Sequence, residues 1–401
     1  MKVIFEDQTF SFELLRTLSY APFGGADIGE CLSTAYRIEE GDFESWYSEW
    51  YKTASRVYSQ AVEYLERGQR VSARESFLRA HNYYRTAEFF LHGNPDDPRI
   101  LDTWGKSRSS FQQAIPLMDT PVEVLKIPYE KTYLPAYFFR VDDAMKPRPT
   151  LLIHGGFDST VEELYLEVVA SALQRGYNCL TFEGPGQGAV IREQKIPFRH
   201  DWEKVVTPMV DYLESRQEVD RNRIALMGIS LGGYLAPRAA AFEHRLAACV
   251  ANDGMFSNQF GAISRKFYPG NPEDLENPVL LDSFLQKLMK QSIGVRWAVE
   301  NGMFTYQAQS MQELIEKTEP VTLEGVADKI KCPTLVCEAE NDHFFAEQPQ
   351  MLFDALNCPK TFMRFTTEDS AEEHCQFGAL IYFNQRLFEW LDETLGSQSN
   401  S

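Results

Sequence analysis

The stretch that decides the fold is RIALMGISLGGYLAPRAAA, residues 223–241. Its apolar run at 224–227 has the character of a buried strand, and the alanine-rich segment that ends the stretch predicts a helix. Between them, Gly228 and Gly232 flank Ser230 where a strand and a helix come closest in a sharp turn. The stretch therefore predicts a strand, a tight turn that presents a serine, and a helix.

The composition is that of a globular protein. Its 401 residues, 44% of them hydrophobic, suffice for a large core, and the formal net charge of −19 argues against a nucleic-acid partner. The opening residues, MKVIFEDQTF, lack a signal-peptide pattern, and no run of about 18 apolar residues occurs. We therefore expect a cytoplasmic protein that binds neither nucleic acid nor membrane. The seven cysteines form no C-x-x-C pair, so most are expected to be buried thiols, and no metal site is expected.

The first third of the chain has helical periodicity. Apolar residues recur every three or four positions over 46–65, the pattern of one buried helix face, and Gly68 closes that helix. Ser72 and Glu75 have the spacing of a capping box, which predicts that a second helix starts there and runs to residues 93–95. The N-terminal region is therefore expected to be a helical domain.

From residue 121 onward, short apolar runs alternate with helical segments, except for a long interval at 255–326. This alternation predicts a mostly parallel sheet covered on both faces by helices, an α/β fold, and the first two runs predict a hairpin. The runs lie at 122–127, 133–141, 151–153, 177–182, 224–227, 247–251, 334–337 and 362–365. The expected domains are a helical domain at 1–120, an α/β domain at 121–254 and 327–394, a helical cap insertion at 255–326, and a disordered tail at 395–401.

The loop after the run at 151–153 is suited to binding a negatively charged oxygen. It contains two glycines, which allow the backbone N–H groups of Gly156 or Phe157 to face inward. Together with the N–H of Leu231, either group would form a two-donor oxyanion hole. His154, at the start of the loop, is expected to brace it rather than to act in catalysis.

An acid and a base follow the last two strands in chain order. Asp342 is the predicted acid, with Glu340 as the alternative near the same turn. His374 lies beyond the last strand and is the predicted base, whereas His343 adjoins the acid in sequence and is poorly placed to lie between it and Ser230. The order serine, acid, histidine is that of a nucleophilic triad carried on an α/β sheet.

The glycine-rich loop at 183–188 superficially resembles a phosphate-binding loop. It lacks both G-K-[ST] and G-x-G-x-x-G, so a nucleotide site is not expected. No cofactor is predicted.

With these residues assembled, the chain resembles the α/β-hydrolase superfamily, in the branch of 2,6-dihydroxypseudooxynicotine hydrolase and the fungal hydrolases that shorten heptaketide pigment precursors. The resemblance extends to the N-terminal segment, which is similar to that branch's appended helical domain. The motifs that carry it are HGGFDSTVEELY at 154–165, FEGPGQG at 182–188, GISLGGYLAPRAAA at 228–241, END at 340–342 and EEHC at 372–375.

The resemblance implies a serine hydrolase that acts, through an acyl-enzyme on Ser230, on an aromatic or polyketide-like ketone or ester, by cleaving a carbon–carbon or an ester bond. A carbanion leaving group would need an acid, for which Asp253 and Tyr306 are the candidates, although Asp253 is also suited to capping a turn. The alternative is a cyclase or acyltransferase in which an internal or non-water nucleophile attacks the acyl-enzyme. The expected partner is a small-molecule substrate, and a homodimer is left open.

Overall fold

The computed structural model describes residues 1–258 and 268–396. The chain forms two compact units, each built from two separate segments. Met1–Asp119 and Phe260–Lys317 make up the first unit, and Thr120–Gln259 and Thr318–Ser401 make up the second. The segment predicted as a cap insertion thus contributes helices to the same unit as the N-terminal helices, and its role as a cap stays a prediction.

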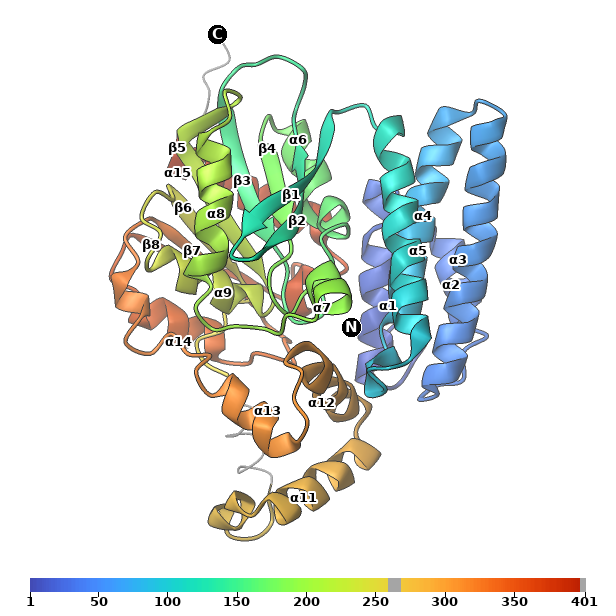
Figure 1. Cartoon of the computed structure of the whole chain (residues 1–401), viewed down its shortest axis with the longest axis vertical. Coiled ribbons are helices and arrows are strands. Elements are labelled where there is room, and N and C mark those ends of the chain that lie inside the picture. Colours follow the sequence, from blue (N-terminus) through green and yellow to red (C-terminus); the bar gives the residue numbers. More distant parts are fainter. Residues whose placement is uncertain (259–267, 397–401) are drawn as a thin grey trace. The chain divides into compact units, whose positions relative to one another are not determined.

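The first unit is helical, and its two longest helices pack against each other (Figure 1). Trp46, Trp50, Ala54 and Val57 are fully buried along one face of the longest helix, as their spacing predicts, and the side chain of Asp42 caps its first turn. The helices are α1 (Gln8–Ser19), η1 (Ala21–Phe23), α2 (Ile28–Ala35), α3 (Phe43–Glu66), α4 (Arg70–Glu88), η2 (Leu91–Gly93), α5 (Pro98–Ala114), η3 (Ile115–Leu117), η5 (Pro272–Glu276), α11 (Pro278–Gln291), α12 (Ile293–Thr305) and α13 (Met311–Thr318).

The predicted capping box at the start of the second long helix is wrong. α4 begins at Arg70, so Ser72 and Glu75 lie inside it. The reason is the tight connection from α3: Gly68 adopts a φ of 74°, and the N–H of Gln69 donates to the carbonyl of Tyr64 at 2.9 Å. This turn leaves so few residues between the helices that α4 starts before the capping pattern.

Helix α12 packs with the segment that follows α4, although about 200 residues separate them in the sequence. The rings of Phe89 and Trp297 stack with centroids 5.0 Å apart. The Nδ1 atom of His92 lies 2.8 Å from Oδ1 of Asn301, and the ring of His92 stacks on Phe304 at 4.4 Å. These aromatic and polar contacts join the two sequence segments of the first unit.

The second unit is built on an eight-stranded sheet in the order β1-β2-β4-β3-β5-β6-β7-β8. β1 pairs with β2 and β2 with β4 in antiparallel fashion, and every other neighbouring pair is parallel. The predicted hairpin and the mostly parallel sheet are confirmed. The strands are β1 (Val122–Tyr129), β2 (Thr132–Phe139), β3 (Arg148–His154), β4 (Asn178–Phe182), β5 (Val219–Ile229), β6 (Ala248–Asn252), β7 (Thr334–Ala339) and β8 (Lys360–Phe365).

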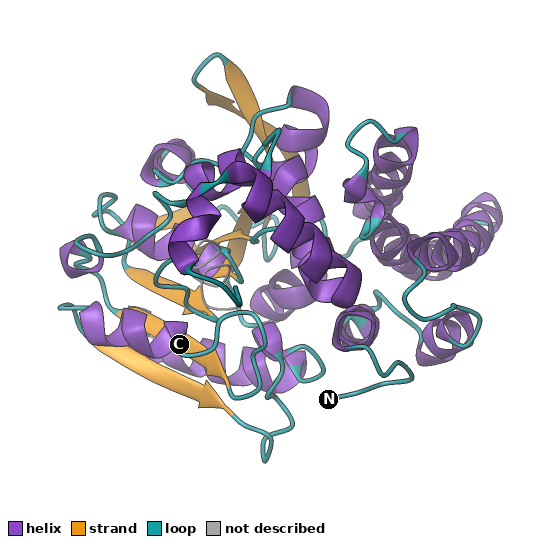
Figure 2. Cartoon of the chain, turned by 90° about the horizontal axis from the view of Figure 1, so that it is seen from below, coloured by secondary structure: helices purple, strands orange, loops and turns teal. Residues whose placement is uncertain are grey.

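Helices cover both faces of this sheet. Figure 1 shows α8 in front of the strands and α15 behind them, and Figure 2 shows the strands in orange between purple helices. The sheet is therefore shielded from water on both sides, and its central strands are buried at nearly every position, without alternation. The helices are η4 (Tyr165–Val169, a π-helix), α6 (Ala170–Gln174), α7 (Gly188–Gln194), α8 (Glu203–Glu214), α9 (Gly232–Ala240), η6 (Ala327–Lys329), α14 (Gln348–Ala355), η7 (His374–Gln376) and α15 (Leu380–Leu395).

The register of the parallel strands brings the predicted loops to one edge of the sheet. His154 at the end of β3 pairs with Gly228 of β5, and Ile229 of β5 pairs with Asn252 of β6. The loops that follow β3, β5 and β6 therefore begin side by side. This edge, where the carboxyl ends of the parallel strands meet, is where ligands bind in open α/β sheets.

Three further predictions concern the rest of the chain. Five of the seven cysteines are buried, as expected. Leu395 ends α15, and residues 397–401, most of the predicted tail, lie outside the described residues. Within 1–258 and 268–396, no helix combines the length and the apolar character needed to cross a lipid bilayer.

Candidate active site

Ser230 lies at the tip of a sharp turn between β5 and α9. Its φ of 63° is in the left-handed region, which costs a residue other than glycine roughly 1–3 kcal/mol. Two backbone hydrogen bonds hold the turn: Ser230 donates to the carbonyl of Asn252 at 3.1 Å, and Gly233 donates to the carbonyl of Ser230 at 2.6 Å. The surrounding backbone therefore forces the strain on the serine and presents its side chain at the edge of the sheet.

The glycines around Ser230 are required by close packing. A Cβ atom on Gly228 would overlap the carbonyl of Gly232, because strand and helix touch there. A Cβ atom on Gly232 would lie 2.9 Å from the carbonyl oxygen of Gly155, in the loop after β3. The two positions that the sequence singled out are thus sites without room for a side chain.

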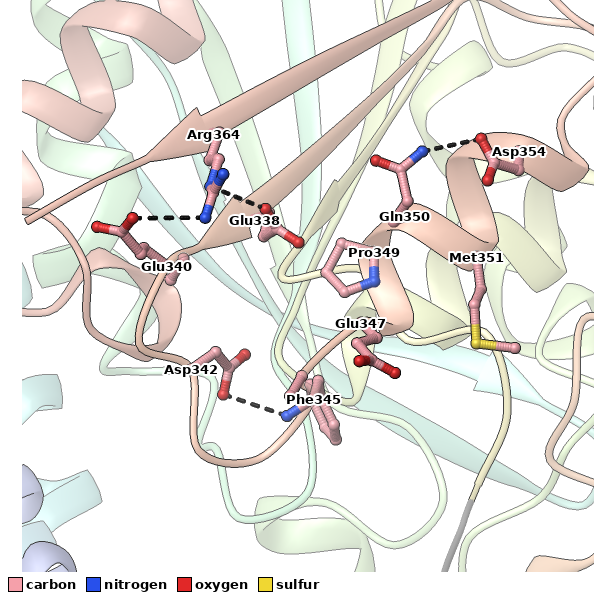
Figure 3. A pocket seen from close by; sticks show the side chains of 12 residues that line it. Glu338, Glu340, Asp342, Phe345, Glu347, Pro349, Gln350, Met351, Asp354 and Arg364 are labelled. Atoms are coloured by element: carbon pink, nitrogen blue, oxygen red, sulfur yellow. Dashed lines mark hydrogen bonds and ion pairs between the residues drawn. The ribbon is translucent and has the colours of Figure 1, made fainter.

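A chain of hydrogen bonds links Ser230, His374 and Asp342. Nε2 of His374 lies 2.9 Å from Oγ of Ser230, and Nδ1 of the same ring lies 2.8 Å from Oδ2 of Asp342. The other carboxylate oxygen of Asp342 accepts hydrogen bonds from the backbone N–H groups of Phe344 at 2.7 Å and Phe345 at 3.2 Å; the second is drawn in Figure 3. The carboxylate is thereby fixed with one oxygen facing the imidazole.

The two alternative residues lie in other environments. His343 is exposed, and its ring packs against Phe344 with centroids 3.9 Å apart. Glu340 accepts a hydrogen bond of 2.8 Å from the N–H of Thr367 and forms an ion pair of 3.4 Å with Arg364. Asp342 and His374, rather than these neighbours, are the residues that the fold joins to Ser230.

The surroundings of Asp342 and His374 shift the pKa values of both side chains. Burial raises the pKa of Asp342, but the charge of His374 and the hydrogen bonds it receives outweigh this, so its pKa lies below the usual value. Burial lowers the pKa of His374, but the charge of Asp342 and the hydrogen bonds to nearby carboxylates outweigh it, so its pKa lies well above the usual value. The site therefore favours an imidazolium next to a carboxylate.

The loop after β3 comes into direct contact with the serine turn. A Cβ atom on Gly156 would lie 2.7 Å from the backbone nitrogen of Leu231 and 3.0 Å from Cβ of Ser230. Among the residues that the structure describes, the N–H groups of Gly156 and Leu231 make no hydrogen bond. Leu231 also precedes the first turn of α9, where the helix dipole is positive. The backbones of the two loops that carry the predicted donors thus lie against each other at Ser230.

Gln187, in the loop after β4, holds the loop after β3 in place. It is buried, and its Nε2 donates to the carbonyls of Gly155 at 2.8 Å and Gly156 at 3.1 Å. Its Oε1 accepts the N–H of Gly184 at 3.0 Å, which fixes the direction of the amide. From the sequence, this loop is a motif of the family resemblance in which no nucleotide site is expected, and Gln187 itself has no predicted role. The signal that could have found Gln187 is a glutamine within a glycine-rich loop, because the carbonyls of buried loops need hydrogen-bond donors.

His154 braces the same loop. Its ring is fully buried, and its Nδ1 lies 3.0 Å from the carbonyl oxygen of Gly155. Burial lowers the pKa of His154 to about 4, so the ring is neutral near pH 7. A neutral ring hydrogen-bonded to the backbone fits a structural residue, the role expected from the sequence.

The two candidate leaving-group acids lie in different units. Asp253 follows β6 and is fully buried on the Nδ1 side of His374, whereas Ser230 is on the Nε2 side. Tyr306 ends α12 in the first unit, where Lys317 donates to its backbone carbonyl at 3.0 Å. Handling of substrate by Tyr306 stays a prediction.

A family model described as "Alpha/beta hydrolase family" matches residues 150–372, more than half of the chain, from within β3 to the loop before His374. The chain belongs to the alpha/beta hydrolase family. It is 34% identical over 98% of both chains to the 20-hydroxy-prefusarin hydrolase of Gibberella moniliformis, and 37% identical over 96% of both chains to the hydrolase acrC of Aspergillus aculeatus. The solved 2,6-dihydroxy-pseudo-oxynicotine hydrolase shares its fold with a TM-score of 0.74 at 21% identity, over 95% of this chain and 96% of that one. These findings confirm the fold and the branch inferred from the motifs.

A pocket of about 580 Å³ adjoins Asp342 in this alpha/beta hydrolase (Figure 3). Three of its lining residues form ion pairs: Arg364 bridges Glu338 at 3.2 Å and Glu340 at 3.4 Å. Ser230 and His374 are not among the residues that line it. Of the three residues joined by hydrogen bonds, Asp342 is the one that lines this pocket.

Asp253, His374 and Cys375 form a group whose potential ligand atoms all lie within 4.8 Å of one another. Each of the three is poorly suited to bind a metal ion. Asp253 already accepts hydrogen bonds from Cys375 and Gln376, and Nδ1 of His374 faces the carboxylate of Asp342. Burial raises the pKa of the Cys375 thiol to about 12. A metal ion requires a deprotonated thiolate, so the donor set does not favour one.

Proposed function

We propose that this protein is a serine hydrolase that forms an acyl-enzyme on Ser230 from an aromatic or polyketide-like ketone or ester. The observation that carries the proposal is the unbroken chain from Oγ of Ser230 to Nε2 of His374 and from Nδ1 to Asp342, on a strained turn. Support for the substrate class comes from full-length similarity to a hydrolase named for 20-hydroxy-prefusarin.

In the first half of the reaction, Ser230 transfers its hydroxyl proton to Nε2 of His374 while Oγ bonds to the substrate carbonyl carbon. The carbonyl oxygen becomes an oxyanion, which accepts hydrogen bonds from the N–H of Leu231 and from that of Gly156 or Phe157. His374 then gives its proton to the departing group, an alkoxide oxygen for an ester or an enolate carbon for a ketone. The carbonyl re-forms as an acyl ester of Ser230.

In the second half, water replaces the serine hydroxyl. His374 takes a proton from the water, whose oxygen bonds to the acyl carbon, and then returns that proton to Oγ of Ser230 as the ester breaks. The product is a carboxylic acid with one oxygen from water. Asp342 keeps Nδ1 protonated and stabilises the imidazolium in both halves.

The first test of the proposal is covalent labelling. A fluorophosphonate probe should label the wild-type protein on Ser230, identified by peptide mass spectrometry, and should fail to label Ser230→Ala. Ser110→Ala is the matched control, because Ser110 is a helix serine whose hydroxyl donates to the carbonyl of Lys106, and it should be labelled like the wild type. Equal labelling of Ser230→Ala and wild type would overturn the proposal.

The second test identifies the reaction. The protein is incubated with aryl esters and β-diketones in oxygen-18 water, and the products are analysed by mass spectrometry. Label in a carboxylic acid supports hydrolysis, and the remaining product tells whether an ester or a carbon–carbon bond was cut. An unlabelled lactone or transferred ester would instead identify the cyclase or acyltransferase.

A further inference from the structure

A second carboxylate lies next to the catalytic histidine. Asp253 directly follows β6, at a φ of 50°, and its side chain is fully buried. Its Oδ2 atom lies 3.2 Å from Nδ1 of His374, whose nearer acceptor is Asp342 at 2.8 Å. Nδ1 therefore faces two carboxylates, which arrive from the ends of two different strands.

The same carboxylate binds the turn that carries His374. Oδ2 of Asp253 accepts a short hydrogen bond from the N–H of Cys375, and Oδ1 accepts one of 3.1 Å from Nε2 of Gln376. Cys375 and Gln376 both adopt left-handed backbone conformations, with φ of 54° and 55°, which are unfavourable for residues other than glycine. Three consecutive residues of the turn thus converge on one buried acid.

We propose that Asp253 is a positioning residue for the reaction, a second carboxylate beside Nδ1 that stabilises the imidazolium of His374 when Ser230 is deprotonated. The inference rests on the proposed function, because it assigns a role within that mechanism. Buried charges are costly unless paired, so two carboxylates at one imidazole are best accounted for by a positive charge that appears between them.

Several groups around this pair bear on its titration. Burial and the charge of Asp342 raise the pKa of Asp253, and its contacts with His374 and Cys375 offset this only in part, so the pKa lies above the usual value. Among the described residues, the charged and titratable groups that act on Asp253 or His374, or on their direct neighbours, include Asp342, His343 and Glu340 in the loop after β7, Cys337 and Glu338 on β7, Cys375 in the same turn, Glu167 on η4, Arg364 on β8 and Arg386 on α15.

Asp253→Asn separates the charge from the hydrogen bonds. The Asn oxygen can still accept the N–H of Cys375, and its NH₂ group would then face Gln376. Among the described residues, Oε1 of Gln376 has no hydrogen-bond partner, so a half-turn of that amide restores the second bond. The variant therefore keeps the turn and removes one negative charge beside Nδ1.

The pH dependence of kcat/KM distinguishes an electrostatic role from a purely structural one. In Asp253→Asn, the plateau at high pH should fall about tenfold, and the midpoint of the acid limb should move to lower pH, because the imidazolium loses a stabilising charge. The matched control is Glu340→Gln, which removes a charge nearby but leaves both carboxylates at Nδ1, and it should keep the wild-type profile. An unchanged midpoint in Asp253→Asn, with or without a lower plateau, would overturn the inference.

A second measurement applies even where Asp253→Asn folds poorly. In Asp342→Asn, Nδ1 still faces Asp253, so a nitrogen-15 NMR titration should find the pKa of His374 above the ordinary value of about 6.5. A pKa at or below that value would contradict the role of Asp253. Fluorophosphonate labelling of the wild type separates the two proposals: a protein that labels on Ser230 but fails these tests loses only the inference about Asp253.

Discussion

The side-chain amide of Gln187 donates a hydrogen bond of 2.8 Å to the carbonyl oxygen of Gly155, which ties the loop after β4 to the loop after β3. The second loop carries the proposed oxyanion donors Gly156 and Phe157. Gln187 therefore holds the loop of these donors in place through the carbonyls of Gly155 and Gly156.

Loss of this tie should slow catalysis. Gln187→Leu cannot donate to the two carbonyls, so the loop loses its fixed direction and kcat should fall about 10- to 100-fold, somewhat less than for removal of an oxyanion donor itself. Gln187→Glu has the same shape but no hydrogen-bond donor when ionised, so its kcat should fall by a similar factor. Gln194→Leu is the control, since Gln194 bonds to β2 instead, and it should keep the wild-type kcat. Normal turnover by Gln187→Leu would contradict this role.

Gly156→Ala should block the site while leaving the rest of the domain folded. Its Cβ atom would lie 2.7 Å from both the nitrogen of Leu231 and the carbonyl oxygen of Ile229, so the two loops must separate and the paired donors are lost. We expect kcat to fall on the order of 10²-fold or more. Gly105→Ala in α5, where a Cβ meets no atom within 4 Å, is the control and should stabilise the protein by roughly 0.5–1 kcal/mol. Steady-state kinetics and melting curves check both outcomes.

The two histidines near the acid should differ sharply in importance. His374→Ala removes the proposed base, so kcat should fall on the order of 10³-fold or more while circular dichroism stays that of the wild type. His343→Ala, at an exposed position beside Phe344, should cost far less. An inactive His343→Ala with an active His374→Ala would require a different base.

Activity should rise with pH over an unusually high range. In the proposed mechanism neutral His374 is the base, and the charge of Asp342 raises its pKa well above the usual value, so the proton is retained to higher pH. The midpoint of the acid limb of kcat/KM should therefore lie above about 6.5. Asp342→Asn should move that midpoint to lower pH. A wild-type midpoint below 6 would conflict with the charge arrangement at Nδ1.

Chelation should leave activity intact. The proposed mechanism uses only side chains and backbone N–H groups, and the thiol nearest His374 is held protonated by burial. Turnover before and after dialysis against EDTA should agree. Loss of activity that a divalent ion restores would show that a metal takes part.

The local sequence was sufficient to predict the strands and the serine turn, because apolar runs and close-packed glycines reflect short-range constraints. Each strand that the apolar runs predicted is present, within a few residues at its ends. The start of α4 was missed because the turn at Gly68 decided it, against the capping pattern of Ser72 and Glu75. Turn geometry outweighed a motif in that case.

Other features depend on contacts between distant segments and leave no local pattern. In the sequence, Asp253 has only the character of a turn residue. Its partner, the backbone N–H of Cys375, lies about 120 residues later in the chain. Gln187 likewise acts on carbonyls more than 30 residues earlier. The choice between Asp342 and its alternative Glu340, two residues away in the sequence, depends on the fold: Asp342 faces the ring of His374, whereas Glu340 bonds to Thr367.

The stacking of Phe89 on Trp297 has a consequence for how the protein is made. A ribosome that adds 5–20 residues per second needs roughly 10–40 s to pass from the first of these rings to the second. During that time Phe89 and His92 lack the partners that α12 supplies, and the nascent helices expose an apolar face to chaperones and to other chains. Expression yield should therefore depend on translation speed across this interval, and a fragment that stops before α12 should aggregate.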